Sequence, residues 1–415
     1  MRHSRQAAVS DRRPTGRVAL PRLRWIILGL VFLATVINYL DRQTLSVLAP
    51  VLQDEFRMTP ITYSRIVSAF MLAYTIMNGL SGPVIDRLGA KLGYALTVAW
   101  WSTAEILHAF SGGVVSLGIF RFFLGMGEAG NWPGAIKVVA EWFPPGERAL
   151  ASGIFNSGSS IGALLAPPLV TWITLRFGWR EAFAFIGLSG FAWLLLWWAI
   201  YRSSDSVSSG PNVRPPRLRT LLKDPFLLQL TASKVFSDPV WYFYIFWFPQ
   251  YLKSARGFTL LEIGRTAWIP FLAADLGNLL GGVVSALLIR RGMPAARAHR
   301  LCVVRFSLLM TAAIPAVLTG NPAVSIGFVS LAALGYAGSL ANLLSIPADA
   351  FPKEQVSSVW GIASMGAGLG GMVFSLITGS IVERWSFTPV FLLFGTIPLL
   401  AAWMVWRLPT RSASG

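Results

Sequence analysis

Arg121 and Glu128 are oppositely charged residues in a stretch, residues 116–148, whose first two-thirds is apolar. Their spacing places both on one face of a helix, roughly 10 Å apart along its axis. A charged side chain inside a membrane costs about 2.5–3.5 kcal/mol on insertion scales, so such residues usually face the protein interior or a water-filled cavity. We therefore expect this helix to line a polar cavity, and the cavity to be the functional site.

A buried arginine beside a buried carboxylate suits the binding and exchange of ions. A guanidinium can hold a carboxylate through two parallel hydrogen bonds and keeps its charge at every relevant pH. An apolar site favours the protonated form of Glu128, whereas a nearby Arg121 favours the ionised form. We expect Glu128 to face Arg121, so that a change of partner by Arg121 would add or remove a proton without covalent chemistry.

Four polar residues, Asn38, Tyr39, Asp41 and Arg42, interrupt the first apolar segment. Asn38 and Arg42 share a helix face, while Asp41 and Arg42 point about 100° apart and can contact different neighbours. One interpretation is an ion pair that only anchors the outer end of the helix. The other is an internal site, which is favoured because the charges lie two turns inside the apolar boundary near Pro50.

The composition indicates an integral membrane protein with many spans. Of the 415 residues, 54% are hydrophobic and 13% are charged, and that charged fraction is about half that of a soluble domain. The net charge is +17, but Lys and Arg concentrate in segments that would lie on one side of the membrane. This distribution follows the positive-inside rule and explains the basicity without nucleic acid.

The sequence argues against an enzyme, a nucleotide-driven pump or a metal site. Cys302 is the one cysteine, which excludes an internal disulfide, and the three histidines are too scattered for a metal site. No G-x-x-x-x-G-K-[ST] motif occurs, and the glycine-rich run at 366–371 lies inside an apolar helix rather than after a strand. No nucleophile–base cluster is present either, so we expect no enzymatic activity and no cofactor. The first apolar segment is too long for a removed signal peptide.

The apolar segments predict an all-α integral membrane protein with twelve transmembrane helices. An even number of spans places both termini on the same side, and the charge distribution makes that side the cytoplasm. The expected helices cover residues 24–49, 61–84, 92–111, 115–140, 148–173, 180–201, 226–252, 262–289, 300–319, 323–346, 355–381 and 387–407.

A sequence repeat divides the chain into two pseudo-symmetric six-helix bundles. A shift of 208 residues superimposes Phe143, Gly127, Gly130, Gly158 and Gly162 on Phe351, Gly335, Gly338, Gly366 and Gly370. A repeat of half the chain length is typical of two homologous bundles with the same orientation in the membrane. The expected organisation is a basic cytoplasmic tail at 1–23, an N-terminal bundle at 24–201, a cytoplasmic linker at 202–225, a C-terminal bundle at 226–407 and a cytoplasmic tail at 408–415.

The two halves differ in their polar residues, because Arg121 and Glu128 correspond to Val329 and Tyr336. In the second half, Lys234 and Asp238 lie four residues apart, so a structural salt bridge is as plausible as a substrate contact. The aromatic residues after Asp238 are Trp241, Tyr242, Tyr244 and Trp247. Such residues usually pack in the protein interior, but stacked rings also suit the face of a sugar.

Further polar residues lie within the spans. Asn156 can point into the cavity or bond a neighbouring helix, and Glu105 can be interfacial or part of the site. Lys137 is expected to extend toward the membrane surface. Asn342 and Ser364 are the polar candidates on the helices at 323–346 and 355–381.

The turn between the second and third helices carries a family signature. Its pattern is G-x-x-x-D-R-x-G-x-K, formed by Gly82, Asp86, Arg87, Gly89 and Lys91. Gly89 permits a tight turn, and Asp86 can accept hydrogen bonds from a helix N-terminus or a basic partner. The pattern resembles the signature loop of the major facilitator superfamily, which implies a conformational role as a gating loop between the two halves.

Across the whole chain, the sequence resembles the anion:cation symporter family of that superfamily. The motifs that carry this resemblance are NYLDR, R-x-x-x-G-x-G-E and EWFP-x-x-ER, and the stretches at 233–252 and 347–353 resemble hexuronate (glucuronate/galacturonate) transporters. The resemblance implies that Arg42 binds the substrate carboxylate and that Asp41, Arg121 and Glu128 couple protons. The stretch GYAGSLAN before Asn342 departs from many hexuronate transporters.

These observations predict a secondary active transporter that couples protons to the symport of an organic anion, most simply a hexuronate or related sugar acid, by alternating access. The candidate substrate-binding residues are Arg42, Tyr39, Tyr74, Asn156, Trp241, Tyr244, Asn342 and Ser364. A symporter of another carboxylate (an aldonate, tartrate or an aromatic acid), or a uniporter or exchanger, is the alternative. We expect a monomer in the inner (plasma) membrane.

Overall fold

The structure is a computed structural model that describes residues 21–144, 147–202, 221–351 and 353–409. The regular elements within these ranges are helices, and no strand occurs among them. The expected tails at 1–23 and 408–415 and the linker at 202–225 lie largely outside the described residues. Eight of the described helices are long and apolar enough to cross a membrane.

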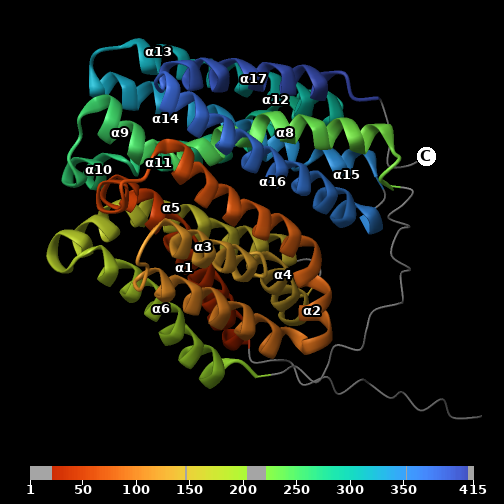
Figure 1. Ribbon diagram of the computed structural model, residues 1–415. Helices are drawn as coiled ribbons and strands as arrows, with labels where there is room; N and C mark the ends of the chain where they lie inside the picture. Colours follow the sequence, from red (N-terminus) through yellow and green to blue (C-terminus); the bar gives the residue numbers. More distant parts are fainter. Residues whose placement is uncertain (1–20, 145–146, 203–220, 352, 410–415) are drawn as a thin grey trace, which may run out of the picture.

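The helices form two groups that lie side by side (Figure 1). The first group contains α1 (Pro21–Phe56), α2 (Pro60–His108), α3 (Val114–Glu128), α4 (Asn131–Trp142), α5 (Arg148–Phe177) and α6 (Trp179–Ile200). The second group contains α8 (Pro225–Phe246), α9 (Phe248–Arg256), α10 (Leu260–Thr266), α11 (Ile269–Arg290), α12 (Ala295–Leu309), η1 (Met310–Ala312), α13 (Ala313–Leu318), α14 (Pro322–Leu343), α15 (Ile346–Ala350), α16 (Lys353–Arg384) and α17 (Thr388–Trp406).

Several expected helices are broken or joined in ways that proline and glycine explain. The helix expected at 226–252 is divided into α8 and α9, with Pro249 in the first turn of α9, because proline has no N–H to continue the ladder of α8. The helices expected at 61–84 and 92–111 join in α2, whose backbone leaves helical geometry at Gly89. The helix expected at 115–140 is divided into α3 and α4.

The repeated glycines make equivalent contacts in the two groups. Gly158 and Gly162 of α5 lie against the backbone of α1, and Gly366 and Gly370 of α16 lie against the backbone of α8. In each case a Cβ atom would meet a carbonyl oxygen of the neighbouring helix at 2.5–2.8 Å. Close approach of this kind is what small residues permit between membrane helices. The pseudo-symmetric pair of helix bundles expected from the repeat is confirmed.

The two groups are joined near one end of the molecule, which we call the far end. It is formed by residues 57–59, α9, α10 and α13, on the left in Figure 1. There the backbone N–H of Ile61 donates to Glu383 at 2.8 Å, and Lys253 pairs with Asp54 at 3.4 Å.

Proline also creates a bond between the groups. Because Pro249 has no N–H, the carbonyl of Ile245 loses its helical donor. The hydroxyl of Ser46 on α1 donates to this carbonyl at 2.6 Å. The hydroxyl of Tyr63 on α2 likewise donates to the carbonyl of Phe246 at 2.6 Å. The break between α8 and α9 therefore supplies acceptors that hold the first group against the second.

Candidate functional site

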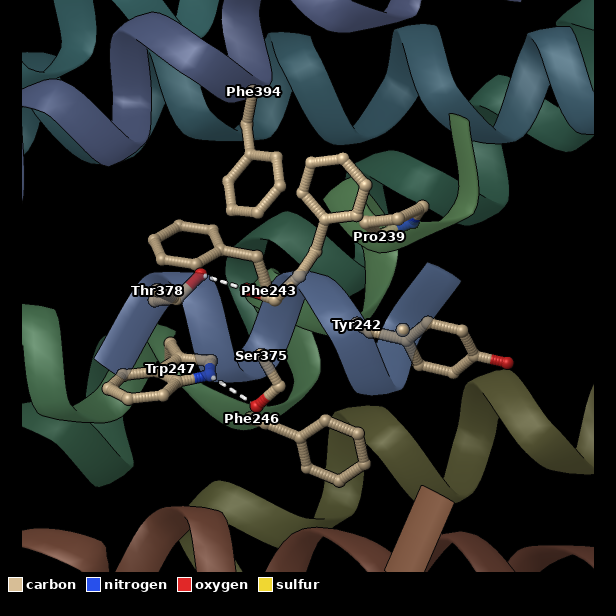
Figure 2. A pocket seen from close by; sticks show the side chains of 10 residues that line it. Pro239, Tyr242, Phe243, Phe246, Trp247, Ser375, Thr378 and Phe394 are labelled. Atoms are coloured by element: carbon tan, nitrogen blue, oxygen red, sulfur yellow. Dashed lines mark hydrogen bonds between the residues drawn. The ribbon is translucent and has the colours of Figure 1, made fainter. Parts of the chain in front are cut away.

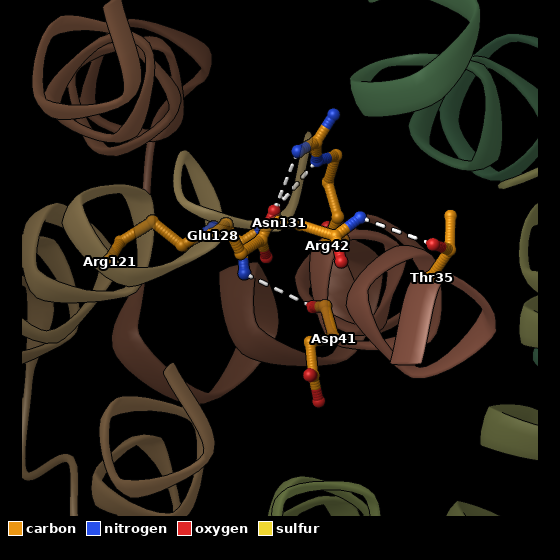
Figure 3. Close-up of polar contacts among 6 residues, drawn as sticks. All are labelled: Thr35, Asp41, Arg42, Arg121, Glu128 and Asn131. Carbon is orange, nitrogen blue, oxygen red and sulfur yellow. Dashed lines mark hydrogen bonds and ion pairs between the residues drawn. The ribbon is translucent and has the colours of Figure 1, made fainter. Parts of the chain in front are cut away.

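Arg42 of α1 and Glu128, the last residue of α3, form an ion pair inside the first group (Figure 3). The Nη2 atom of Arg42 lies 2.8 Å from Oε2 of Glu128, and Nε donates to the same oxygen at 2.8 Å. The side chains are 4% and 0% exposed. Oε1 of Glu128 has no hydrogen-bond donor among the described residues. Glu128 thus holds one cation and keeps one oxygen free to bind a proton.

Arg121 does not pair with Glu128, which corrects the expectation from their shared helix face. Its guanidinium donates to the carbonyl oxygen of Asp41 at 3.3 Å and to the carbonyl oxygen of Arg42. Its guanidinium is engaged by these two carbonyls of α1, while the carboxylate of Glu128 is engaged by Arg42. Arg121 therefore ties α3 to the backbone of α1, and Arg42 is the cation that Glu128 holds.

Aromatic rings surround the guanidinium of Arg42. Its Cζ atom lies 4.7 Å from the ring centroid of Tyr74, 4.9 Å from that of Tyr39 and 5.4 Å from that of Phe70. Such distances allow cation–π attraction in addition to the ion pair. Tyr39 and Tyr74 were expected at the site, whereas Phe70 was missed. Its position four residues before Tyr74, on the same face of α2, is the sequence signal that indicates it.

Two tyrosines of the second group approach this arginine. Tyr242 of α8 lies near Arg42, Tyr39 and Tyr74, and Tyr336 of α14 lies near Tyr39 and Tyr242. We call Tyr39, Tyr74, Tyr242 and Tyr336 the tyrosine cluster. It gathers phenol groups from both helix groups next to one buried cation, so it offers hydrogen-bonding partners for a polar ligand between them.

Beside the tyrosine cluster, the second group contains its own buried ion pair. Lys234 and Asp238 of α8 pair at 2.7 Å, with 3% and 7% of their side chains exposed. Asp238 also accepts a hydrogen bond from Ser237 at 2.9 Å, and Tyr336 lies beside it. The ring of Tyr336 stacks on Trp241 with centroids 5.4 Å apart. The salt bridge left open by the sequence is therefore formed, and it connects to the tyrosine cluster through Tyr336.

Not all of the expected substrate-binding residues join this arrangement. Asn342 is 1% exposed and donates to the carbonyls of Gly281 and Gly338, so it ties α14 to α11. Tyr244 is 1% exposed and lies beside Phe243 and Tyr251 in the apolar interior of the second group. In this conformation both are interior residues, and their contact with a substrate stays a prediction. Asn156 of α5 is exposed and Ser364 of α16 is half-buried.

Asp41 points away from its neighbour Arg42, as their 100° offset predicted (Figure 3). Its carboxylate is fully buried, and neither oxygen has a hydrogen-bond donor among the described residues. The outer-end ion pair considered from the sequence is not formed, because Arg42 binds Glu128 instead.

The signature turn has the expected geometry at Gly89, where φ is +78°. This left-handed conformation favours glycine because it has no Cβ atom. Asp86 accepts from Lys137 of α4 at 2.9 Å, and its own side chain is 71% exposed. The extension of Lys137 toward the membrane surface stays a prediction. Lys91 lies over the ring of Trp198 at 5.1 Å, while Arg87 is exposed and Gly82 lies near Pro133. The described contacts of this turn thus lie within the first group.

A separate pocket lies between α8 and α16 (Figure 2). Its cavity volume of about 10 Å³ is at the lower limit for one water molecule, far below the roughly 300 Å³ of the smallest usual ligand pockets. Phe243, Phe394 and Trp247 line it, with Trp247 donating to Ser375 at 3.3 Å. The ring of Tyr242 points away from these residues in Figure 2. The pocket is an aromatic packing defect, and Tyr242 belongs to the tyrosine cluster.

The sequence matches the model of the Major Facilitator Superfamily over residues 31–330 and 295–415. The chain belongs to the major facilitator superfamily. It is therefore a membrane transporter and not an enzyme.

This major facilitator protein is similar to transporters of sugar acids. It is 31% identical over 405 residues to the hexuronate transporter of Escherichia coli K12, covering 93% of this chain and 94% of that one. It is 35% identical over 283 residues to the galacturonate transporter of Dickeya chrysanthemi, covering 64% and 82%. The D-galactonate transporter of Escherichia coli O6:H1 is 28% identical over 407 residues, with 92% and 94% covered.

Solved structures show the same fold in a distantly similar protein. The crystal structure of a bacterial homologue of the human lysosomal transporter Spinster, inward-facing and occupied, matches with a TM-score of 0.75 and 18% identity, covering 94% of this chain and 97% of that one. The unoccupied structure matches with a TM-score of 0.71 and 19% identity, covering 94% and 95%.

Proposed function

We propose that this protein is a proton-coupled symporter of a hexuronate or related sugar acid. The observation that carries the proposal is the buried ion pair between Arg42 and Glu128, which lies against tyrosines from both helix groups. The named relatives transport hexuronate, galacturonate and D-galactonate. These anions have one carboxylate and several hydroxyl groups, which are the groups that an arginine and a tyrosine cluster recognise.

The substrate carboxylate would bind the guanidinium of Arg42 through two hydrogen bonds. Phenol groups of the tyrosine cluster would bond the sugar hydroxyls, and the stacked rings of Trp241 and Tyr336 would face the ring of the sugar. Specificity follows because a buried polar site rejects a ligand that leaves its groups unpaired. Asn156 and Ser364 keep their proposed place at the edge of this site.

Proton coupling would follow from competition for Arg42. When a substrate carboxylate takes the guanidinium, Glu128 loses its cation while it stays in an apolar surrounding. Its charged form then becomes costly, and binding a proton neutralises it. Substrate and proton would therefore bind together, with Arg42 rather than Arg121 as the residue that changes partner. Arg121 would hold α1 and α3 at the spacing that this exchange needs.

Alternating access would use the contacts at the far end. The positive-inside rule places the basic tails on the cytoplasmic side of the inner membrane, so the far end would face outward and this conformation would be closed to the outside. Separation of α1 from α9 and of α2 from α16 would open the site outward. The turn at 82–91 would then exchange its present bond from Asp86 to Lys137 for contacts with the second group. A monomer suffices for this cycle.

Uptake of radiolabelled glucuronate into proteoliposomes tests the proposal. We expect an inward proton gradient to stimulate uptake and unlabelled galacturonate to compete. Uptake that ignores the gradient would indicate a uniporter or exchanger. An absence of uptake, followed by gradient-driven uptake of tartrate or an aromatic acid, would replace the substrate while keeping the coupling.

A further inference from the structure

Glu105 of α2 is a buried carboxylate that the proposed substrate site does not use. Its side chain is 0% exposed, and neither oxygen has a well-formed hydrogen bond from a described residue. The carboxylate of Asp41 on α1 is likewise 0% exposed, and neither of its oxygens has a hydrogen-bond donor among the described residues. Thr44, on the same face of α1 as Asp41, lies near Glu105 but donates to the carbonyl of Leu40 at 2.8 Å. Asp41 and Glu105 lie near enough to each other that their charges would repel if both were ionised.

The buried charges of the first group do not balance when every carboxylate is ionised. Asp41, Glu105 and Glu128 are the acids, and Arg42 and Arg121 are the bases. Arg42 compensates Glu128, which leaves Arg121 in the field of both other acids. An uncompensated charge in an apolar interior is strongly destabilising, whereas one proton on either carboxylate makes the set neutral. Two carboxylates that share a site bind a proton for this reason.

His108 is the other titratable group beside Glu105, and its contacts make it neutral. Its Nδ1 atom lies 2.7 Å from the carbonyl oxygen of Ala104 and 3.8 Å from Glu105. A carbonyl oxygen only accepts, so Nδ1 carries the hydrogen. The Nε2 atom has no partner among the described residues, and the ring stacks on Phe183 at 5.0 Å. A second ring proton would be buried without an acceptor, so the extra proton belongs to the carboxylates.

We propose that Asp41 and Glu105 share one proton in this conformation and that Glu105 is a second proton-binding residue of the transport cycle. The role in the cycle rests on the proposed proton coupling, whereas the shared proton does not. Arg121 controls the site, because its guanidinium now donates to the carbonyls of Asp41 and Arg42. If it turns to the two carboxylates when the site opens to water, the guanidinium and the water together stabilise both charges, and the proton leaves to solvent.

Infrared difference spectroscopy of the purified protein without substrate tests the shared proton. At neutral pH we expect the carbonyl stretch of a buried carboxylic acid in the native protein. Asp41→Asn and Glu105→Gln should each abolish this band, because either change leaves one carboxylate for Arg121 to compensate. The control Asp238→Asn, which removes a buried acid already paired with Lys234, should keep it.

Three results would overturn the proposal. The native protein could show no carboxylic acid band, or the band could survive Asp41→Asn and so belong to Glu105 alone. The band could also disappear when sodium ions are added, which would mean that a cation rather than a proton compensates the two carboxylates. If Glu105→Gln does not fold, two other measurements test the proposal. Glu105→Asp should retain the band. Carbon-13 labelling of aspartate or of glutamate should each shift the native band, because both residue types contribute to it. Failure of glucuronate uptake would bear only on the proposed function, because the spectra contain no substrate.

Discussion

The guanidinium of Arg42 and the carboxylate of Glu128 meet in an ion pair with two N–O distances of 2.8 Å, although 86 residues separate them in the sequence. Removing one partner of a buried pair typically costs about 3–5 kcal/mol, because the other charge stays buried without compensation. A substrate carboxylate and a proton together avoid this cost: the carboxylate compensates Arg42 and the proton neutralises Glu128. The pair is therefore suited to bind both ligands or neither.

Arg42→Lys should weaken substrate binding while keeping the charge. An ammonium group cannot form two parallel hydrogen bonds with a carboxylate, and hydrogen bonds to charged groups contribute about 1.5–3 kcal/mol. We expect KM for glucuronate uptake to rise about tenfold or more. Arg180→Lys is the matched control, since Arg180 is 47% exposed and pairs with Glu55 at the surface. An unchanged KM in Arg42→Lys would place the carboxylate elsewhere.

Glu128→Gln should remove the effect of the proton gradient. The amide resembles a protonated carboxyl group that can no longer release its proton, so the ratio of uptake with and without a gradient should fall to about one. Parallel measurement of both rates in one batch of proteoliposomes gives this ratio. A ratio that stays at the native value would exclude Glu128 as the coupling residue.

Gly158→Ala should destabilise the packing of α5 on α1. A Cβ atom at Gly158 would lie 2.6 Å from the carbonyl oxygen of Phe32, whereas a Cβ atom at Gly153 meets nothing within 4 Å. Overpacking typically costs about 1–3 kcal/mol, so we expect a lower thermal midpoint for Gly158→Ala in detergent. Gly153→Ala, on the same helix, should leave the midpoint unchanged or raise it. Equal midpoints for both variants would contradict the close contact.

A cross-link between the groups at the far end should stop transport. Asp54 and Lys253 belong to different groups and pair at 3.4 Å. Cysteines at these positions should therefore react with a short thiol cross-linker that forms reducible disulfide bonds. We expect uptake to be lost and to return after reduction. Cysteines in place of Glu55 and Arg180, which pair within the first group, should be cross-linked without loss. Continued uptake through the Asp54–Lys253 cross-link would show that the far end does not open.

The fold could be predicted well because its signals are local or periodic. Apolar segments of membrane length mark the helices, and the 208-residue repeat marks the two bundles, which the packing of Gly158 and Gly366 confirms. The breaks were missed because a proline such as Pro249 can kink a helix or divide it, and tertiary contacts decide which occurs. Here the hydroxyl of Ser46 satisfies the carbonyl that Pro249 leaves free.

The sequence could indicate residues of the candidate site but not how their charges pair. Helical spacing gives the helix face on which Arg121 and Glu128 lie and their positions along the helix axis. The partner of each residue depends on how α1 is rotated about its own axis, which the spacing of residues does not show. Arg42 therefore took the place at Glu128 that was expected for Arg121. Asn342 looked like a ligand contact because it is polar in an apolar segment. Its amide bonds two carbonyls between α11 and α14 instead, which is the ordinary role of a buried polar group.

The most direct test of the account is the pH outside proteoliposomes when glucuronate is added to a weakly buffered suspension. Symport removes a proton from the outer solution with each substrate, so the native protein should cause an alkaline shift that a protonophore abolishes. Glu128→Gln should cause no such shift. Uptake of glucuronate by the native protein without any change in pH would contradict the exchange between substrate and proton at Arg42 and Glu128.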